Sequence, residues 1–343
     1  MNFNFIQQSM EKNSKSNAFL EQLQLAINQN LIPKKSATIL HGFYIEYKTA
    51  TLQASEKTER IFLTFLELVI LQCTSPFAFS HYHQRLRKDF DYHKFALDFV
   101  RPLIDVSSSS LQGELYLEEM NAHLKNKDNV VLFANHQSEG DPQMISILLE
   151  KKFPKIAEDL IFVAGDRVIS DPLAVPLSLG CNLLCIYSKR YIDNPPELKM
   201  KKQLHNKKTM DTMSCLLKKG GNIIYVAPSG GRDRSNNKGV IEVADFDSPS
   251  IEMFHLMAKR SLHPTHFYPL ALKTYAILPP PKAIQVELGE SRTVGYGPIQ
   301  IAFGPEIDME NYALKKSSDK HARRKERAEF ICNLVRKMYN DFF

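Results

Sequence analysis

The segment NHQSEGDP, residues 135–142, places a histidine and an aspartate five positions apart directly after an apolar run. That run, NVVLFA (129–134), predicts a buried strand, and Pro142 predicts the start of a helix. A carboxylate that accepts a hydrogen bond from one imidazole nitrogen fixes the tautomer and leaves the other nitrogen as a base. We therefore predict that His136 is a general base oriented by Asp141. Asp141 can at the same time be the N-cap of the helix, with Pro142 as its first residue.

Ser138 offers an alternative nucleophile in the same segment. HQSEG resembles the G-x-S-x-G elbow of serine hydrolases, but His136 stands where that elbow has its first glycine. A serine hydrolase or esterase that uses Ser138 is the alternative function. The simplest role for this hydroxyl is a hydrogen bond to the backbone of its own loop.

Two arginines follow a second apolar run. NIIYVA (222–227) predicts a buried strand, and the next segment, PSGGRDR, carries Arg232 and Arg234. Residues two apart on an extended segment point to the same side, so Asp233 points away from both arginines. Two guanidiniums beside a glycine-rich turn can form a fork for a phosphate dianion. A base for a hydroxyl beside such a fork indicates a small phosphorylated alcohol as the substrate.

Two further cations follow other apolar runs. Lys189 lies in SKRY and could close the same pocket. Arg167 lies in AGDRV and is a further candidate for binding the phosphate, although it could equally form an ion pair with Asp166 or Asp171. We expect these loops to meet only if the runs before them are parallel strands of one sheet.

The apolar runs alternate with helical stretches, which indicates a sheet covered by helices on both faces. We predict an α/β fold with a mostly parallel or mixed sheet whose functional groups lie beyond the carboxyl ends of the strands. The predicted strands are 129–134, 160–164, 182–187, 222–227, 265–272, AIQVEL (283–288) and IQIAFG (299–304).

Helical patterns occupy both ends of the chain. Apolar residues recur at three- and four-residue spacing in segments 17–31, 34–52 and 56–72, which predicts a small bundle. TSPFAFS (74–80) interrupts the pattern, so we predict a helical domain over 1–78 and an α/β catalytic domain over 79–343. The last 23 residues predict an amphipathic helix with one apolar face, formed by Ile331, Leu334, Val335, Met338 and Phe342.

Composition restricts the class of protein. The net charge of +6 suits an anionic substrate or an acidic protein partner. No nucleic-acid-reading motif is present, so we expect no nucleic acid partner. The cysteines, Cys73, Cys181, Cys185, Cys215 and Cys332, form no paired C-x-x-C motifs. We therefore expect a reducing compartment, no disulfide framework and no metal site.

Hydropathy and the N-terminal sequence bear on localisation. The longest apolar run, residues 61–73, contains Glu67 and is too short to span a bilayer. The N-terminal residues have neither an apolar signal core nor the arginines of a transit peptide. We expect a soluble cytoplasmic protein with at most peripheral membrane contact, or a protein of the plastid stroma if a targeting segment has been removed.

Taken together, the motifs resemble those of a known family. NHQSEGDP contains the H-x-x-x-x-D signature of glycerolipid acyltransferases, and FVAGDRVISDPL, NLLCIYSK, IYVAPSGGRDR and YPLAL…PPP follow in order. From about residue 76 to residue 297 the chain is similar to the soluble glycerol-3-phosphate acyltransferases of plastids and bacteria. That family transfers a fatty acyl group from acyl carrier protein or coenzyme A to the first hydroxyl of sn-glycerol 3-phosphate. The resemblance implies an enzyme without a cofactor, acting at the first step of phospholipid biosynthesis.

The resemblance also implies a role for each candidate residue. His136 is the general base and Asp141 is its orienting partner. The residues implied to bind phosphate are Lys189, Arg232 and Arg234, with Arg190 and Arg167 as additional candidates. Arg190 is a departure, because members of the family carry a histidine after that lysine.

The resemblance and the charge pattern also suggest a partner and an oxyanion site. The basic segments 151–155, 199–208 and 321–327 are candidate contacts for an acidic acyl carrier protein. Backbone N–H groups near the helix that begins at Pro142 are candidates for stabilising the oxyanion. The same fold could also act on a lysophospholipid, or bind lipid without any catalytic activity.

Overall fold

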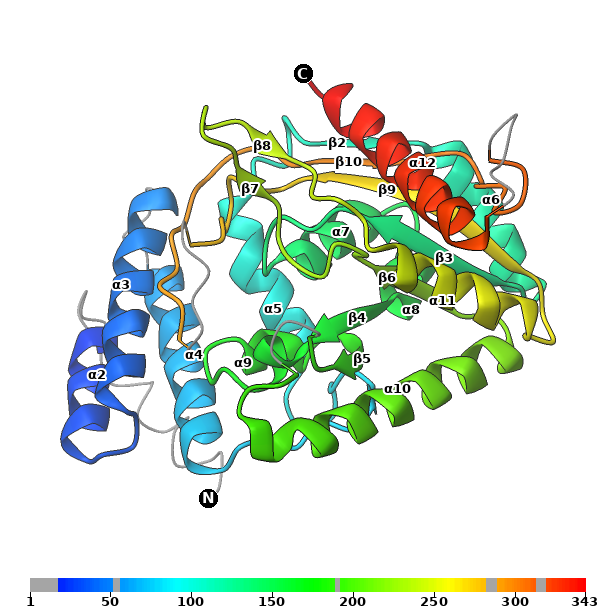
Figure 1. Cartoon of the computed structure of the whole chain (residues 1–343). Helices are drawn as coiled ribbons and strands as arrows, with labels where there is room; N and C mark the ends of the chain where they lie inside the picture. Colours follow the sequence, from blue (N-terminus) through cyan, green and yellow to red (C-terminus); the bar gives the residue numbers. More distant parts are fainter. Residues whose placement is uncertain (1–17, 52–55, 189–191, 282–288, 313–318) are drawn as a thin grey trace.

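The computed structural model describes residues 18–51, 56–188, 192–281, 289–312 and 319–343. An eight-stranded mixed sheet lies at its centre, between two layers of helices (Figure 1). The strands of this sheet are β1 (Tyr82–His83), β2 (Ser110–Gln112), β3 (Asn129–Ala134), β4 (Ile161–Gly165), β5 (Asn182–Ile186), β6 (Ile223–Val226), β9 (Thr265–Lys273) and β10 (Gln300–Phe303). A separate short ribbon consists of β7 (Arg234–Ser235) and β8 (Ile241–Glu242). The predicted α/β fold is confirmed.

The order of strands across the sheet is β1-β5-β4-β6-β3-β9-β10-β2. The five strands from β5 to β9 run parallel to one another. β1 and β10 are antiparallel to their neighbours β5 and β9. Because parallel strands end at one edge of a sheet, the loops after all five central strands reach the same edge. The candidate residues that the structure describes lie in those loops or just beyond them.

Six of the seven predicted strands are confirmed within one or two residues, as β3, β4, β5, β6, β9 and β10. The seventh, 283–288, lies outside the described residues. β1 and β2 have only two and three residues, and they lie at the two margins of the sheet. Strands this short give no apolar run, so the sequence did not predict them.

Side chains of β3 alternate between the two faces of the sheet, as the period of a strand requires. Val130 and Leu132 pack against one helical layer, whereas Val131 and Phe133 pack against the other. The first layer contains α6 (Glu114–Lys125), α7 (Asp141–Leu149) and α8 (Pro154–Asp159). The second layer contains α10 (Lys199–Lys219), α11 (Ser248–Lys259) and α12 (Lys320–Asn340). Burial on both faces explains why the central strands read as continuous apolar runs.

The amphipathic C-terminal helix is confirmed as α12. Ile331 and Val335 are fully buried against the sheet layer, and Phe342 is buried just beyond the end of the helix. Leu334 and Met338 are partly buried in the same cluster. The predicted apolar face is therefore the face that packs on the sheet.

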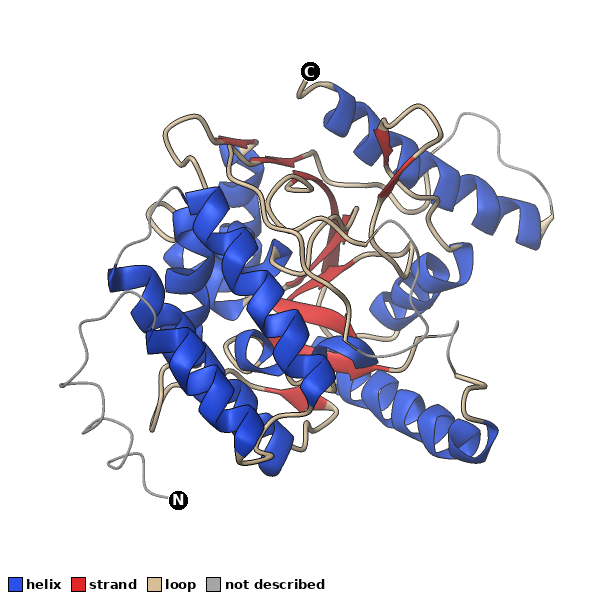
Figure 2. Ribbon diagram, turned by 90° about the vertical axis from the view of Figure 1, so that its left-hand side faces the viewer, coloured by secondary structure: helices blue, strands red, loops and turns tan. Residues whose placement is uncertain are grey.

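The three predicted N-terminal helices are α2 (Ala18–Asn28), α3 (Lys34–Thr51) and α4 (Glu56–Thr74). They stand side by side at one flank of the sheet (Figure 2). Their buried residues form one continuous cluster with α5 (Tyr92–Val100), α7 and α9 (Val175–Ser178). The predicted boundary near residue 78 therefore separates two segments that share an apolar core, and the division into two domains stays a prediction.

Glu67 is a partly buried carboxyl among the apolar side chains of α4, and burial raises its pKa from 4.5 to about 7. Since the folded pKa lies above the unfolded one, the neutral form favours folding, and this stability is lost as pH rises from 4.5 to about 7. We expect Glu67→Gln to raise the free energy of unfolding by about 1–2 kcal/mol near pH 8 and to have little effect near pH 4, after allowance for partial exposure. Denaturant unfolding at both pH values measures this difference.

The exposed Glu46 of α3 provides the matched control, because its replacement by glutamine removes the same charge without a burial cost. An equal gain from Glu67→Gln at both pH values would contradict the assignment of the effect to ionisation.

Within the described ranges, no helix is both long and apolar enough to cross a membrane. All five cysteines are free thiols.

Candidate active site

The functional loops meet where the parallel strands end. The loop after β3 carries His136, the loop after β4 carries Arg167, and the loop after β6 carries Arg232. β9 ends at Lys273, so Thr274 reaches the same edge. The loop after β5 begins at Tyr187, and its predicted ligands, Lys189 and Arg190, lie outside the described residues.

His136 and Asp141 form the predicted dyad. His136 Nδ1 lies 2.8 Å from Asp141 Oδ2. The carboxylate is almost fully buried, with 1% of its side chain exposed, whereas the imidazole is 30% exposed. A neutral imidazole that donates through Nδ1–H carries its free lone pair on Nε2. The dyad therefore presents a base toward the solvent-accessible side of the loop and buries the group that orients it.

Two further donors fix the carboxylate of Asp141. The backbone N–H of Gln137 donates to Oδ2 at 2.9 Å, and the hydroxyl of Thr274 donates to Oδ1 at 2.6 Å. Donors on both oxygens hold the carboxylate plane in one orientation. Asp141 thus has little freedom to turn away from the imidazole.

The prediction that Asp141 is the helix N-cap is wrong by one residue. The N-cap of α7 is Gly140, which has no side chain to cap the helix, and Asp141 is the first helical residue. The physical reason is competition, because the carboxylate already accepts hydrogen bonds from His136, Gln137 and Thr274. An acid in the first turn still interacts favourably with the helix dipole.

Ser138 has the simpler of its two predicted roles. Its side chain is fully buried, and its Oγ accepts a hydrogen bond from the N–H of Gly140 at 3.1 Å. The N–H of Asp141 donates to the carbonyl of Ser138 at 3.1 Å. Three backbone N–H groups of this loop, those of Gln137, Gly140 and Asp141, therefore donate within the loop and brace it.

A buried polar network joins the loops after β3 and β6. The N–H of Asp233 donates to the carbonyl of His136 at 2.6 Å. The carboxylate of Asp233 is fully buried and accepts from the amides of Asn135 and Gln137 and from the N–H of Ala244. Burial raises the pKa of this carboxyl, although these donors oppose the shift. Asp233 points into the protein interior and ties the arginine loop to the histidine loop.

Two of the predicted cations meet on one carboxylate, that of Glu290. Arg167 Nη1 lies 2.6 Å from Glu290 Oε1, and Arg232 Nη2 lies 2.5 Å from Glu290 Oε2. Glu290 is therefore the partner of Arg167, in place of the predicted Asp166 or Asp171. Arg234 differs, because its guanidinium donates to the carbonyl of Pro281.

Arg292 connects this group to the N-terminal helices. Its Nε lies 3.1 Å from Glu139 Oε2, and its Nη2 lies 3.2 Å from Asp171 Oδ2. The guanidinium also lies 6.0 Å from the ring centre of Phe43 on α3. Burial disfavours the charged form of both Glu139 and Arg292. The ion pairs of these two residues outweigh the effect of burial, so the pKa of Glu139 is lowered and the pKa of Arg292 is raised.

The described structure thus brings together His136, Asp141, Arg167 and Arg232. Sequence reasoning missed Glu290, Arg292 and Thr274, and it gave no role to Glu139. Glu290 and Arg292 lie in GESR (289–292), and their partners are between 58 and 153 residues away along the chain. No spacing along the chain could indicate those contacts.

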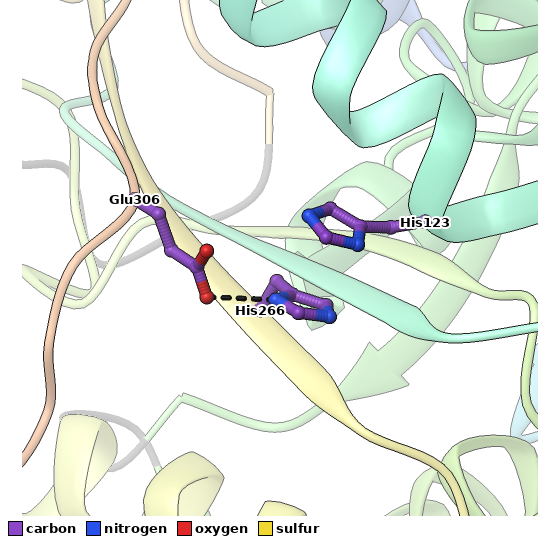
Figure 3. Close-up of side chains that lie close together, drawn as sticks. All are labelled: His123, His266 and Glu306. Atoms are coloured by element: carbon purple, nitrogen blue, oxygen red, sulfur yellow. Dashed lines mark hydrogen bonds and ion pairs between the residues drawn. The ribbon is translucent and has the colours of Figure 1, made fainter. Parts of the chain in front are cut away.

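A second group of titratable side chains lies at the opposite edge of the sheet (Figure 3). His123, His266 and Glu306 place potential ligand atoms within 4.8 Å of one another, and His266 Nδ1 lies 2.7 Å from Glu306 Oε1. The two imidazoles stack with centroids 3.5 Å apart and planes 16° from parallel. Lone pairs in nearly parallel rings do not converge on one point, so we assign no metal ion to this group.

The chain is similar to proteins of one known family. The acyltransferase family model matches residues 117–273, which include the dyad and Arg232. A chloroplastic glycerol-3-phosphate acyltransferase of Cucurbita moschata is 39% identical over 298 residues, covering 85% of this chain and 67% of the relative. The Spinacia oleracea enzyme of the same name is 37% identical over 315 residues, covering 90% of this chain and 66% of the relative.

Two more proteins extend the comparison. The Arabidopsis thaliana chloroplastic glycerol-3-phosphate acyltransferase is 37% identical over 298 residues, covering 85% of this chain and 65% of the relative. A crystal structure of the 1-acyl-sn-glycerophosphate acyltransferase PlsC of Thermotoga maritima aligns over 94% of each chain, with 12% identity and a TM-score of 0.42. The chain spans about two thirds of the length of the plant relatives that it matches. From these identities and coverages, the chain belongs to the family of the chloroplastic glycerol-3-phosphate acyltransferases.

Proposed function

We propose that this protein transfers a fatty acyl group from a thioester donor to the sn-1 hydroxyl of sn-glycerol 3-phosphate. The product would be 1-acylglycerol 3-phosphate, formed at the first step of phospholipid biosynthesis. One observation carries the proposal: the loop that holds the base is bonded to the loop that holds Arg232, through the 2.6 Å contact from Asp233 N to His136 O. Because the two loops are joined, a base and a cation that can bind phosphate lie in one site. Such a site suits an acceptor that has both a hydroxyl and a phosphate.

The mechanism uses the two nitrogens of His136 differently. Nε2 takes the proton of the acceptor hydroxyl as that oxygen attacks the thioester carbonyl. Asp141, on Nδ1, stabilises the imidazolium that forms. When the tetrahedral intermediate collapses, the carbon–sulfur bond breaks and the imidazolium returns the proton to the leaving thiolate. The acyl group passes directly to the acceptor, so no acyl-enzyme on Ser138 is needed.

The phosphate would be held by cations from three loops. Arg232 is central to the proposal because it lies beside Glu139 in the histidine loop. The other residues proposed to bind the phosphate are Arg167, Arg234, Lys189 and Arg190, of which the last two lie outside the described residues.

Acyl carrier protein is the proposed donor carrier, with coenzyme A as the alternative. Four lysines of α10 are exposed on its first three turns: Lys199, Lys201, Lys207 and Lys208. An exposed cationic face of this kind suits an acidic partner, and steering by charge weakens as salt screens it. The names of the plant relatives support a plastid location, which would be the stroma. Contact with a membrane would be peripheral.

One experiment tests the activity and the donor together. The purified chain is incubated with glycerol 3-phosphate and with palmitoyl thioesters of either carrier, and the product is identified by mass. We expect 1-acylglycerol 3-phosphate, with a rate on the carrier-protein donor that falls as salt is raised from about 0.05 to 0.5 M. Release of free fatty acid without acylated acceptor would favour the hydrolase, and equal salt dependence with both donors would count against carrier-protein docking.

A further inference from the structure

Among the described residues, Glu290 is the one carboxylate that contacts two of the candidate phosphate ligands. Arg167 and Arg232 come from loops after different strands, and each places one guanidinium nitrogen on a different oxygen of Glu290. All three side chains are largely buried, with exposed fractions of 9% for Glu290, 14% for Arg232 and 23% for Arg167. The geometry is that of a carboxylate bridge between two cations.

The carboxylate bridge offsets the repulsion between the two arginines. Two guanidiniums repel each other, and the repulsion grows when water is excluded from around them. A carboxylate between them replaces the repulsion with two charge-assisted hydrogen bonds and fixes the orientation of both planar groups. A guanidinium has five N–H donors, so the bond from Arg232 to Glu290 still leaves donors that can reach a ligand.

The other carboxylate near Arg232 is already engaged elsewhere. Glu139 lies 3.7 Å from Arg232 Nη1, beyond a good hydrogen bond, but only 3.1 Å from Arg292 Nε. Arg292 is therefore the nearer ion-pair partner of Glu139. Glu290 remains as the residue that sets the position of Arg232.

We propose that Glu290 is a positioning residue, which holds Arg167 and Arg232 side by side as a fork for the phosphate of glycerol 3-phosphate. This inference rests on the proposed function for the identity of the ligand. It adds Arg167 to the fork by a defined contact, and it assigns a role to a residue outside every motif of the sequence. It also differs from a structural ion pair, because Arg167 and Arg232 come from loops beyond the carboxyl edge of the sheet, and Arg232 lies 3.7 Å from Glu139 in the loop that carries the base.

The chain contains a matched control for this bridge. Glu252 on α11 also joins two arginines, through contacts of 3.1 Å with Arg324 Nε and 2.5 Å with Arg327 Nη1. Its exposed fraction of 12% is close to that of Glu290. These arginines lie on α12, so this second bridge fastens α11 to α12 and shares no residue with the proposed fork. Glu252→Gln therefore reproduces the loss of a buried bridge without touching the proposed fork.

Steady-state kinetics of Glu290→Gln and Glu252→Gln test the inference. We expect Glu290→Gln to raise the KM for glycerol 3-phosphate by about tenfold or more, with kcat and the KM for the acyl donor changed by less than about twofold. Glu252→Gln should leave all three constants near the wild-type values. Glu290→Asp keeps the charge on a shorter side chain and should give an intermediate KM.

Calorimetric binding of inorganic phosphate provides a readout that does not depend on turnover. Weaker binding to Glu290→Gln, together with normal binding to Glu252→Gln, supports the fork even if the wild-type protein acylates no glycerol 3-phosphate; in that case only the proposed function fails. Unchanged phosphate affinity and unchanged KM in Glu290→Gln would overturn the inference. A lower KM would also overturn it, because Glu290 would then compete with phosphate for the arginines. If Glu290→Gln does not fold, Glu290→Asp decides by the same criteria.

Discussion

Replacing His136 by alanine is expected to lower kcat by a factor of about 10²–10⁴, the usual contribution of a positioned general base. Asp141 occupies Nδ1 of His136, so the lone pair on Nε2 remains available to accept the proton of the acceptor hydroxyl. The KM for glycerol 3-phosphate should change little, because the proposed phosphate contacts come from other loops. Initial rates at saturating concentrations of both substrates measure the effect.

Two variants in the same loop distinguish the general base from a serine nucleophile. Asp141→Asn keeps the shape of the side chain but removes the charge that stabilises the imidazolium, so we expect a large loss of kcat in that variant too. Ser138→Ala should retain turnover, because the hydroxyl of Ser138 is buried and bonded to the N–H of Gly140. Near wild-type turnover in His136→Ala, or complete inactivity of a folded Ser138→Ala, would contradict the base and favour the hydrolase.

Replacing Arg232 by alanine is expected to weaken the binding of glycerol 3-phosphate. Loss of one partner of a largely buried, hydrogen-bonded charge pair costs about 2–5 kcal/mol, which corresponds to a rise in KM of about 30-fold or more. The KM for the acyl donor should stay within about threefold, because the thioester needs no contact with the phosphate fork. Saturation curves for each substrate, with the other held constant, show the difference.

Arg327→Ala is the matched control for Arg232→Ala. Arg327 is 10% exposed and pairs with Glu252, so the variant leaves a similarly buried glutamate without one of its arginines. If Arg327→Ala raised the KM for glycerol 3-phosphate as much as Arg232→Ala does, the effect would reflect general destabilisation. If Arg232→Ala saturated normally with glycerol 3-phosphate, the phosphate would have to bind elsewhere.

The sheet was predictable from the sequence because its central strands are buried on both faces. NVVLFA became β3 with the predicted bounds, because burial on both faces favours apolar residues, and these fill every position of the strand after Asn129. β1 pairs with β5 through only two residues, Tyr82 and His83. A strand that short depends on its neighbour for stability and leaves no periodic pattern to detect.

The dyad was predictable because its two members are local. His136 and Asp141 lie within one turn between a strand and a helix, so the chain itself limits their separation. The capping role of Asp141 was wrong by one residue because Thr274, 133 positions away, donates to the same carboxylate. A long-range hydrogen bond of this kind changes a local preference and cannot be read from local spacing.

The arginine group shows the same limit more strongly. Arg167 and Arg232 were identified as cations after strands, but the acid that joins them, Glu290, lies 58 positions beyond Arg232. The segment that contains it, GESR (289–292), follows the predicted strand 283–288 and has no strand or helix pattern of its own. Only the folded chain reveals that one glutamate sets the spacing of two arginines and that Arg292 links the same site to Phe43 of α3.

A crystal structure of the protein with bound glycerol 3-phosphate would show whether one acceptor reaches both the base and the cations. We expect the phosphate to contact Arg232 and the sn-1 hydroxyl to lie about 2.6–3.2 Å from Nε2 of His136, within hydrogen-bond reach. A phosphate bound away from Arg232, or a hydroxyl on the far side of the sheet edge from His136, would contradict this expectation.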